Sequence, residues 1–223
     1  MDFELPKDVE EKRKQAREFA LSEFTEERKR KYDEIEKFPF EVRKAALEKG
    51  IIDYSNPWKL LVTIEELCRV DPGLGISSFV SAFGSEVLML LGTEEQKKKY
   101  LEPVLRGEKI MGFAVTEPVA GSDVAGIATK IEREGDHWVM NGSKMFITNG
   151  SIADFLLVLA RNGPPPSEEK RHHNMTMAIV ETKWPGVSTN KLTGKMGVRA
   201  TDTAEIILDH VQIPNEHLTR DVA

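Results

Sequence analysis

The chain has 223 residues, of which 40% are hydrophobic and 30% are charged. This length fits one large domain or two smaller ones, and the apolar content is enough for a packed core. A formal charge of −6 argues against a general nucleic-acid-binding surface, which needs a basic face. Cys68 is the only cysteine, so no disulfide can form within the chain, and a cytoplasmic location is expected.

Neither secretion nor membrane insertion is expected from the sequence. The chain starts with the acidic run Met1-Asp2-Phe3-Glu4, which lacks the apolar core of a signal peptide. The most apolar stretch, residues 79–91, is interrupted by Gly84 and Glu86 and falls short of the roughly 18 apolar residues of a membrane-spanning helix. The five histidines show no His-Glu-x-x-His spacing and no partner cysteines, so no metal site is expected.

The first 109 residues carry the signals of helices. Thr25 precedes a charged run that it can cap, Pro39 begins a segment that Gly50 ends, and Pro57 begins an amphipathic segment that reaches Val70. An apolar segment covers residues 74–91. It is followed by Thr93-Glu94-Glu95-Gln96, which has the form of a capping box and predicts a helix to about residue 105.

From Ile110 onward the apolar residues alternate and β-branched residues accumulate. Asn141-Gly142 between apolar flanks predicts a type I′ hairpin that joins strands 137–140 and 144–148. Further short strands are expected over 127–133, 154–160, 175–180, 204–209 and 211–213. Many short strands at regular spacing are typical of a small barrel or sandwich.

The predicted fold is therefore an α+β multidomain chain. An N-terminal all-α helical domain covers residues 1–109, and a small β-barrel or β-sandwich domain covers residues 110–223.

One segment concentrates residues suited to binding chemistry. Residues 114–126 begin as an apolar strand and continue as a loop of small residues. In this loop, Gly121-Ser122-Asp123 can present consecutive amides and a hydroxyl to a phosphate group. Small residues also let a ligand approach the backbone closely. A tight turn without a ligand is the alternative interpretation of the same residues.

A second segment, residues 145–150, places Phe146 two residues from Thr148. On a strand, these two side chains share one face. An aromatic side chain beside a hydroxyl donor suits a planar heteroaromatic ring. The alternative is that Phe146 belongs to a core face and Thr148 to an edge.

Taken together and in this order, the motifs resemble those of the acyl-CoA dehydrogenase family. Residues 116–123 (T-E-P-V-A-G-S-D) are similar to the family signature T-E-P-x-A-G-S-D. Residues 141–150 (N-G-S-K-M-F-I-T-N-G) resemble N-G-x-K-x-[WF]-I-T-N-[GA]. Residues 196–203 (M-G-V-R-A-T-D-T) resemble M-G-x-R-x-[ST]-D-T, and residues 96–101 (Q-K-K-K-Y-L) resemble Q-K-x-K-Y-L.

The resemblance implies a helical N-terminal domain, a middle β-domain, and FAD held between the β-domain and a C-terminal helical bundle. The residues that it implies as cofactor-binding are Phe113, Val115, Thr116, Gly121, Ser122, Phe146, Ile147 and Thr148. In the family arrangement, Phe146 would cover one face of the flavin and Thr148 would donate toward its N5 atom. Ser122 would face both the flavin pyrophosphate and the acyl-CoA substrate, and is the one implied substrate-binding residue.

The implied reaction is the α,β-dehydrogenation of an acyl-CoA thioester to a trans-2-enoyl-CoA, as in fatty acid β-oxidation. A proton leaves the α-carbon to a carboxylate, a hydride leaves the β-carbon to the flavin, and the electrons pass to an electron-transferring flavoprotein. The family's base is a glutamate of the C-terminal bundle, so no catalytic base is assigned within these 223 residues. Glu117 is not given that role, and the chain alone is expected to be inactive.

Two other functions remain open from the sequence. The chain could be a non-catalytic flavin- or acyl-CoA-binding or assembly module that needs a companion chain carrying the bundle, or that forms a homo-oligomer. It could also belong to a flavin oxidase or monooxygenase of the same fold, in which oxygen takes the electrons. Acyl-chain length is not readable, because one methylene in an apolar pocket changes binding by only about 1–3 kcal/mol.

Overall fold

The computed structural model describes residues 4–165 and 167–219. The acidic start of the chain and the last four residues of the predicted second domain lie outside this range. The chain forms two compact units: Met1–Val80 with Thr193–Asp202, and Ser81–Leu192 with Thr203–Ala223. The domain bounds predicted from the sequence, 1–109 and 110–223, stay a prediction.

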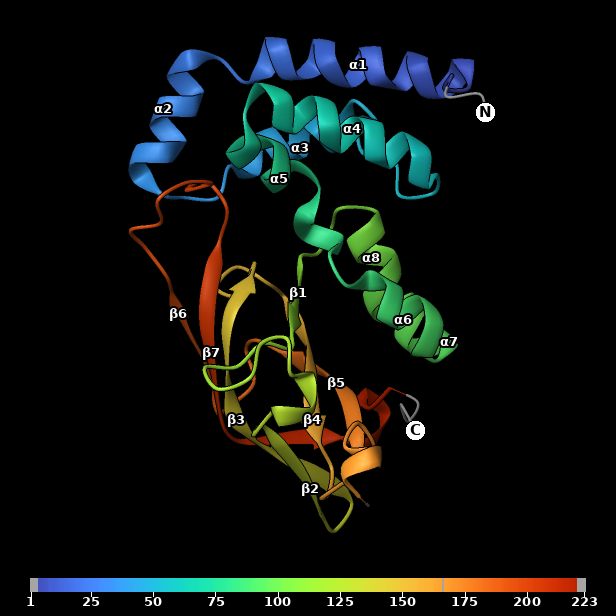
Figure 1. Ribbon diagram of the computed structural model, residues 1–223, viewed down its shortest axis with the longest axis vertical. Helices are drawn as coiled ribbons and strands as arrows, with labels where there is room; N and C mark the ends of the chain where they lie inside the picture. The colour runs from blue at the N-terminus through green and yellow to red at the C-terminus, as the bar shows by residue number, and fades with distance from the viewer. Residues whose placement is uncertain (1–3, 166, 220–223) are drawn as a thin grey trace. The chain divides into compact units, whose positions relative to one another are not determined.

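The first unit is built from helices (Figure 1). They are α1 (Lys7–Glu23), α2 (Glu26–Ile35), α3 (Phe40–Glu48), α4 (Pro57–Val70) and α5 (Pro72–Phe79). The predicted caps are confirmed: Thr25 Oγ1 accepts a hydrogen bond from the Arg28 amide at 3.3 Å, and Gly50 ends the α3 region at a φ of 61°. Both use the physics expected of helix ends, a side chain that accepts from a free amide and a glycine in the left-handed region.

Residues Pro72–Leu91 are long and apolar enough to cross a membrane by length and composition. The stretch is not one regular helix, because α5 is followed by a 3₁₀ turn at Val80–Ala82 and by Gly84 at a φ of 89° before α6 (Ser85–Leu91) begins. More than half of its most apolar window is buried inside the protein. Phe83, Met89 and Leu90 of this stretch remain exposed.

The second unit begins with α6 and a further helical stretch that follows Thr93. This stretch consists of α7 (Glu94–Gln96), a π-helical turn (Lys97–Leu101) and α8 (Glu102–Leu105). The predicted capping box is confirmed, because Thr93 Oγ1 accepts from the Gln96 amide at 3.2 Å and Gln96 Oε1 accepts from the Thr93 amide at 3.0 Å. Tyr100 joins the stretch to the sheet through an edge-on contact with Phe155 at 4.9 Å between ring centroids.

Seven strands form the sheet of the second unit. They are β1 (Met111–Ala114), β2 (Lys130–Glu134), β3 (His137–Thr148), β4 (Phe155–Arg161), β5 (Met175–Glu181), β6 (Val187–Lys191) and β7 (Thr203–Pro214). Their order is β1-β4-β2-β3-β7-β6, and β5 pairs with β4. The α+β class is confirmed: a helical domain is followed by a curled β-sheet domain. Strand β6 is not among the strands predicted from the sequence, and its residues alternate only between half-buried and exposed.

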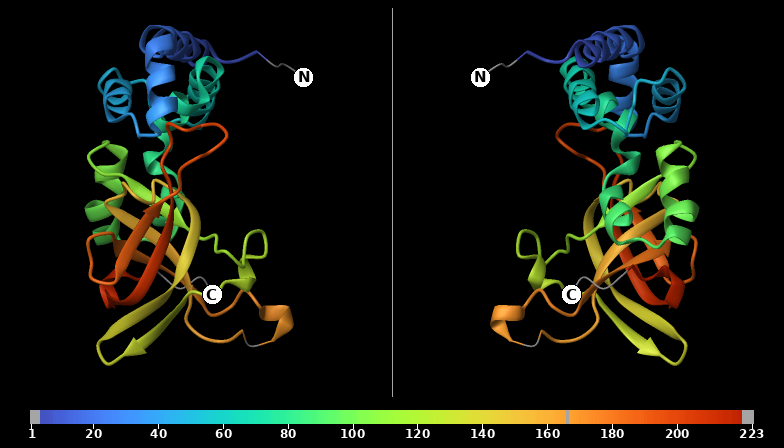
Figure 2. Two further views of the ribbon diagram at one scale, coloured as in Figure 1. Left: turned by 90° about the vertical axis from the view of Figure 1, so that its left-hand side faces the viewer. Right: turned by 90° about the vertical axis from the view of Figure 1, so that its right-hand side faces the viewer.

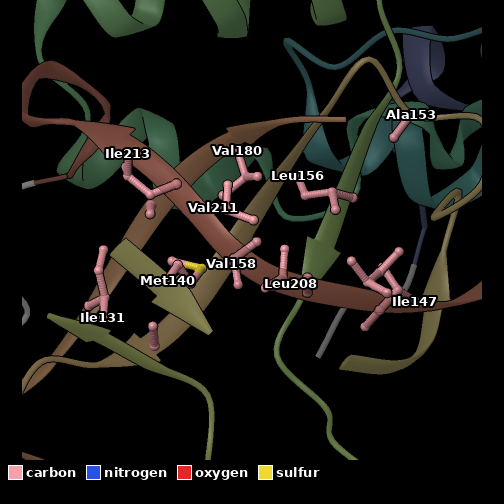
Figure 3. Packing of buried hydrophobic residues seen from close by; sticks show 14 of the residues in the cluster. Ile131, Met140, Ile147, Ala153, Leu156, Val158, Val180, Leu208, Val211 and Ile213 are labelled. Carbon is pink, nitrogen blue, oxygen red and sulfur yellow. The ribbon is translucent and has the colours of Figure 1, made fainter. Parts of the chain in front are cut away.

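The core of the sheet lies on its concave side (Figure 3). Side chains from β2, β3, β4, β5 and β7 point toward one another there; they include Ile131, Met140, Leu156, Val158, Val180, Leu208, Val211 and Ile213. Ile147, near the end of β3, belongs to the same cluster. This packing fixes the end of β3 next to the segments that carry the motifs.

The predicted hairpin at Asn141-Gly142 is wrong. The two expected strands are one continuous strand, β3, which pairs with β2 on one side and β7 on the other. The Asn-Gly pair instead lies where the register between β3 and β7 shifts. There, Asn141 Oδ1 accepts a hydrogen bond from the His210 amide at 2.9 Å, and His210 has a φ of 52°. A Cβ on Gly142 would lie 2.7 Å from Thr129 Cα. Tertiary pairing on both edges overrides the local turn preference, and glycine is needed here for close approach.

Candidate functional site

The two motif segments lie side by side in the second unit. Asn149 Nδ2 donates to the Met111 carbonyl at 3.0 Å, and the Met145 amide donates to the Thr116 carbonyl at 2.8 Å. A Cβ on Gly112 would lie 3.3 Å from the Thr148 carbonyl oxygen. Segment 111–117 therefore runs antiparallel to segment 144–149, although the two are separated by about thirty residues along the chain.

Phe146 is presented to the outside by an irregularity in β3. Between Lys144 and Ile147 the register with β7 shifts by one residue, and Phe146 takes a φ of 60°. A positive φ is uncommon for an aromatic residue and marks a position that its surroundings hold in place. The phenyl group is 67% exposed, whereas the neighbouring Ile147 is buried in the core. The bulge thus aims a large apolar ring away from the core.

The loop that follows β1 starts with a tight reversal. The Glu117 amide donates to the Ala120 carbonyl at 2.9 Å, and the Ala120 amide donates back to the Glu117 carbonyl at 3.2 Å. Pro118 and Val119 form the exposed tip. Gly121 and Ser122 come directly after this reversal and are exposed, and a Cβ on Gly121 would meet no atom within 4 Å. The space beside Gly121 is therefore open to a ligand.

The end of the same loop is anchored by the loop between β4 and β5. Arg161 donates to the Ala125 carbonyl at 2.7 Å, and Arg171 pairs with Asp123 at 2.9 Å. Figure 2 shows the two loops, in lime green and orange, projecting on the same side of the sheet. These contacts fix the loop just after Gly121 and Ser122.

A buried ion pair joins the two motif segments. Lys144 Nζ lies 2.7 Å from Glu117 Oε1, and the two side chains are 0% and 2% exposed. Burial would raise the pKa of Glu117, but hydrogen bonds from Lys144 and from the amides of Thr129 and Ala128 outweigh it and hold that pKa below its usual value. The carboxylate is therefore charged at neutral pH. Burial lowers the pKa of the Lys144 ammonium, and the hydrogen bond and charge of Glu117 oppose that shift.

This shift predicts a pH dependence of stability. Because the pKa of Glu117 is lower in the folded chain than its ordinary value of 4.5, the unfolded chain takes up the proton first as the pH falls. The stability from Glu117 is complete above pH 4.5 and declines below it, by at most about 1.4 kcal/mol per pH unit. The free energy of unfolding of the parent chain should thus exceed that of Glu117→Gln at pH 7, and the gap should narrow below pH 4.5.

The measurement is urea unfolding of both proteins between pH 3 and pH 7. Glu132→Gln is the control, because Glu132 forms an exposed pair with Lys130 at 3.2 Å and such pairs contribute little. A gap between parent and Glu117→Gln that stays constant through the acid range would contradict the assignment of this pKa shift to Glu117.

The other predicted site residues occupy two settings. Phe113, Val115 and Thr116 are half-buried along β1 and its continuation, and Thr148 is half-buried at the end of β3. Phe113 packs edge-on against Phe83 at 6.1 Å between ring centroids. The side chain of Ile147 points into the core, so only the backbone of this residue can contact a ligand. The assignment of all eight residues to a cofactor stays a prediction.

This set of groups fits a flavin ring. The two hydrogen-bonded segments carry apolar side chains (Phe113, Val115, Phe146) and hydroxyls (Thr116, Thr148), and the exposed Gly121 and Ser122 follow in the loop after the first segment. Ligand sites for flat organic groups combine apolar walls with a few well-placed polar groups in this way. Across residues 4–165 and 167–219, no cluster of three or more histidine, cysteine or acidic side chains could hold a metal ion.

Comparison with known families decides the assignment. The family model for the acyl-CoA dehydrogenase N-terminal domain matches residues 6–108. The family model for the acyl-CoA dehydrogenase middle domain matches residues 112–211. The chain belongs to the acyl-CoA dehydrogenase family. The second match contains the motifs at residues 116–123, 141–150 and 196–203, and the motif at residues 96–101 lies in the first match.

Similarity to individual proteins supports the same family assignment. The chain is 36% identical to the short-chain-specific acyl-CoA dehydrogenase of Clostridium acetobutylicum, over 98% of the chain and 59% of that protein. It is 34% identical to CarC, a subunit of the caffeyl-CoA reductase–Etf complex of Acetobacterium woodii, over 94% of the chain and 57% of that protein.

Among solved structures, a glutaryl-CoA dehydrogenase from Mycobacterium smegmatis in complex with FADH2 aligns with a TM-score of 0.83 at 29% identity, covering 96% of the chain and 55% of that structure. The chain thus spans less than two thirds of the length of these relatives.

Sequence reasoning missed three residues that shape the site. Lys144 stands in a polar stretch of the motif and is nevertheless fully buried, and Arg161 and Arg171 anchor a loop far from them in sequence. Only Lys144 gave a usable signal, as a fixed charge inside a family motif. The partners of the two arginines depend on tertiary contacts that no local pattern encodes.

Proposed function

We propose that this chain supplies the flavin-ring side and part of the substrate side of an acyl-CoA dehydrogenase active site. The observation that supports the proposal is the juxtaposition of segments 111–117 and 144–149, which carry the exposed Phe146 and the hydroxyls of Thr116 and Thr148. Bound FAD would supply hydride acceptance for an α,β-dehydrogenation that converts an acyl-CoA to a 2-enoyl-CoA.

In this proposal each residue has a limited task. Phe146 covers one face of the ring, and Phe113 and Val115 provide an apolar wall that excludes water. Thr116 and Thr148 donate hydrogen bonds to polar edges of the ring and so fix its orientation. Gly121 and Ser122 hold the phosphate-bearing part of the cofactor, and Ser122 also faces the acyl-CoA. No residue of this chain is assigned the α-proton, so the chain alone should bind without turnover.

The proposed partners are an acyl-CoA substrate and an electron-transferring flavoprotein. The second is supported by the relative CarC, which is a subunit of a caffeyl-CoA reductase–Etf complex. The same name describes a reductase, which favours a second candidate: the site works in the reductive direction on an enoyl-CoA. A cytoplasmic location is part of the proposal and rests on the sequence alone.

The test is a titration of the purified chain with FAD, followed by flavin absorbance and fluorescence. We expect saturable binding, and Phe146→Ala should weaken it because the ring loses one apolar face. Phe40→Ala is the matched control, since Phe40 is also exposed and lies in the first unit. Adding an acyl-CoA should perturb the flavin spectrum without turnover. Absence of FAD binding, or equal weakening by both substitutions, would contradict the proposal.

Oxygen consumption separates the remaining alternatives. With chemically reduced FAD on the chain, rapid consumption of oxygen would favour an oxidase or monooxygenase of this fold. Slow consumption is expected of a dehydrogenase-type site that passes its electrons to a protein.

A further inference from the structure

Two charged residues with no assigned role connect the halves of the proposed flavin site. Lys144 Nζ donates to Glu117 Oε1 at 2.7 Å and to the Val115 carbonyl at 3.1 Å. Glu117 is the residue after Thr116, and Lys144 lies two residues before Phe146. The pair thus joins segment 111–117 to segment 144–149 directly beside the residues proposed to contact the ring.

The carboxylate also holds the far end of the signature loop. Glu117 Oε2 accepts from the Ala128 amide at 2.6 Å, and Oε1 accepts from the Thr129 amide at 3.0 Å. Glu117 lies at the start of the loop, and its side chain binds the backbone at the end of the loop, eleven residues later. Gly121 and Ser122 lie between these two points.

Burial makes these contacts obligatory. Because the two side chains are 0% and 2% exposed, water cannot replace a lost partner. For the same reason neither side chain can touch a ligand bound at the exposed Phe146. Both act on the site through the backbone that they hold, and the backbone bond from Met145 to the Thr116 carbonyl at 2.8 Å lies between them.

The β-bulge that presents Phe146 begins at Lys144. After an earlier shift between Met140 and Gly142, the register with β7 is regular from Gly142 to Lys144 and shifts again before Ile147. An anchored side chain at the first residue of a bulge defines where the extra residue is placed, and therefore where the ring of Phe146 points.

We propose that Glu117 and Lys144 form a positioning pair, which holds Thr116, the Gly121-Ser122 loop and Phe146 in the arrangement that binds the flavin. This inference rests on the proposed function and adds to it the residues that set the geometry of the site. We assign the pair a positioning role and not a catalytic one, because both side chains are buried.

The test compares Glu117→Gln and Lys144→Gln with Tyr100→Phe in the full chain. Tyr100 is also buried in the second unit, and its hydroxyl donates to Glu181 at 2.7 Å and lies 2.8 Å from His217 Nε2. Tyr100→Phe therefore removes buried hydrogen bonds without touching the motif segments. Two quantities are measured at a temperature where circular dichroism shows each protein folded: the dissociation constant for FAD, and the exchange rate of the Met145 amide without FAD.

We expect Glu117→Gln and Lys144→Gln to weaken FAD binding by about tenfold, the low end of what the loss of an outer partner costs at metal sites. Both should also speed exchange of the Met145 amide, whereas Tyr100→Phe should change neither quantity. If one of the two variants does not fold, the other carries the test.

Three results would overturn the inference. The first is FAD affinity within about twofold of the parent in the folded pair variants. The second is an unchanged Met145 exchange rate, and the third is equal weakening by Tyr100→Phe, which would show general loosening. A parent chain that does not bind FAD is a different result: it removes the proposed function and this inference with it.

Discussion

Lys144→Met is expected to lower the free energy of unfolding of the second unit by about 3–5 kcal/mol, because it leaves a buried carboxylate without its countercharge. The Glu117 carboxylate would keep only the amides of Ala128 and Thr129. Desolvation of an unpaired charge costs far more than a lost surface contact. The loss is measured by urea unfolding, followed through Trp138 and Trp184 fluorescence in a Trp58→Phe background.

The matched control is Lys130→Met. Lys130 lies on the neighbouring strand β2 and pairs with Glu132 at 3.2 Å, but both side chains are more than half exposed. We expect little change in stability, as for most exposed pairs. A loss for Lys144→Met as small as that for Lys130→Met would mean that Glu117 is not charged in the folded chain.

Gly84→Ala is expected to cost about 2–4 kcal/mol, the sum of steric overlap and backbone strain. A Cβ at Gly84 would lie 2.6 Å from Phe113 Cγ and 2.7 Å from Phe113 Cβ, and Gly84 has a φ of 89°. These Phe113 atoms are next to the backbone and cannot rotate away. The same tryptophan fluorescence reports the loss, and FAD affinity should fall as well because Phe113 must move.

Gly135→Ala separates the cost of backbone strain from the cost of steric overlap. Gly135 has a φ of 63° in the turn between β2 and β3, and a Cβ there would meet no atom within 4 Å. Only the left-handed backbone should cost stability at this position, about 1–2 kcal/mol. Equal losses for the two glycines would show that Phe113 yields easily and that Gly84 does not define its place.

Local signals predicted the helices and most strands well. The caps at Thr25, Gly50 and Thr93 and the break at Asp71 follow from the hydrogen-bonding needs of helix ends, which depend on neighbouring residues. The Asn141-Gly142 hairpin failed for the opposite reason. Strands far apart in sequence pair on both sides of β3, and that pairing outweighs a local preference for a turn.

The candidate site shows the same contrast between features that depend on neighbouring residues and features that depend on tertiary contacts. The motifs predicted site residues around Thr116 and Phe146, because their types and spacing are local. The sequence did not show that a buried Glu117–Lys144 pair joins the two segments, since the burial of a charge depends on what packs around it. The positive φ of Phe146, which decides where its ring points, is likewise a product of the register with β7.

The most direct test of the account is amide hydrogen exchange of the chain with and without FAD. The account predicts protection by FAD at residues 113–122 and 146–148, with little change in the turn at Gly135 or around Tyr100. Protection confined to other segments would place the cofactor elsewhere and contradict the account. So would the absence of any protection at saturating FAD.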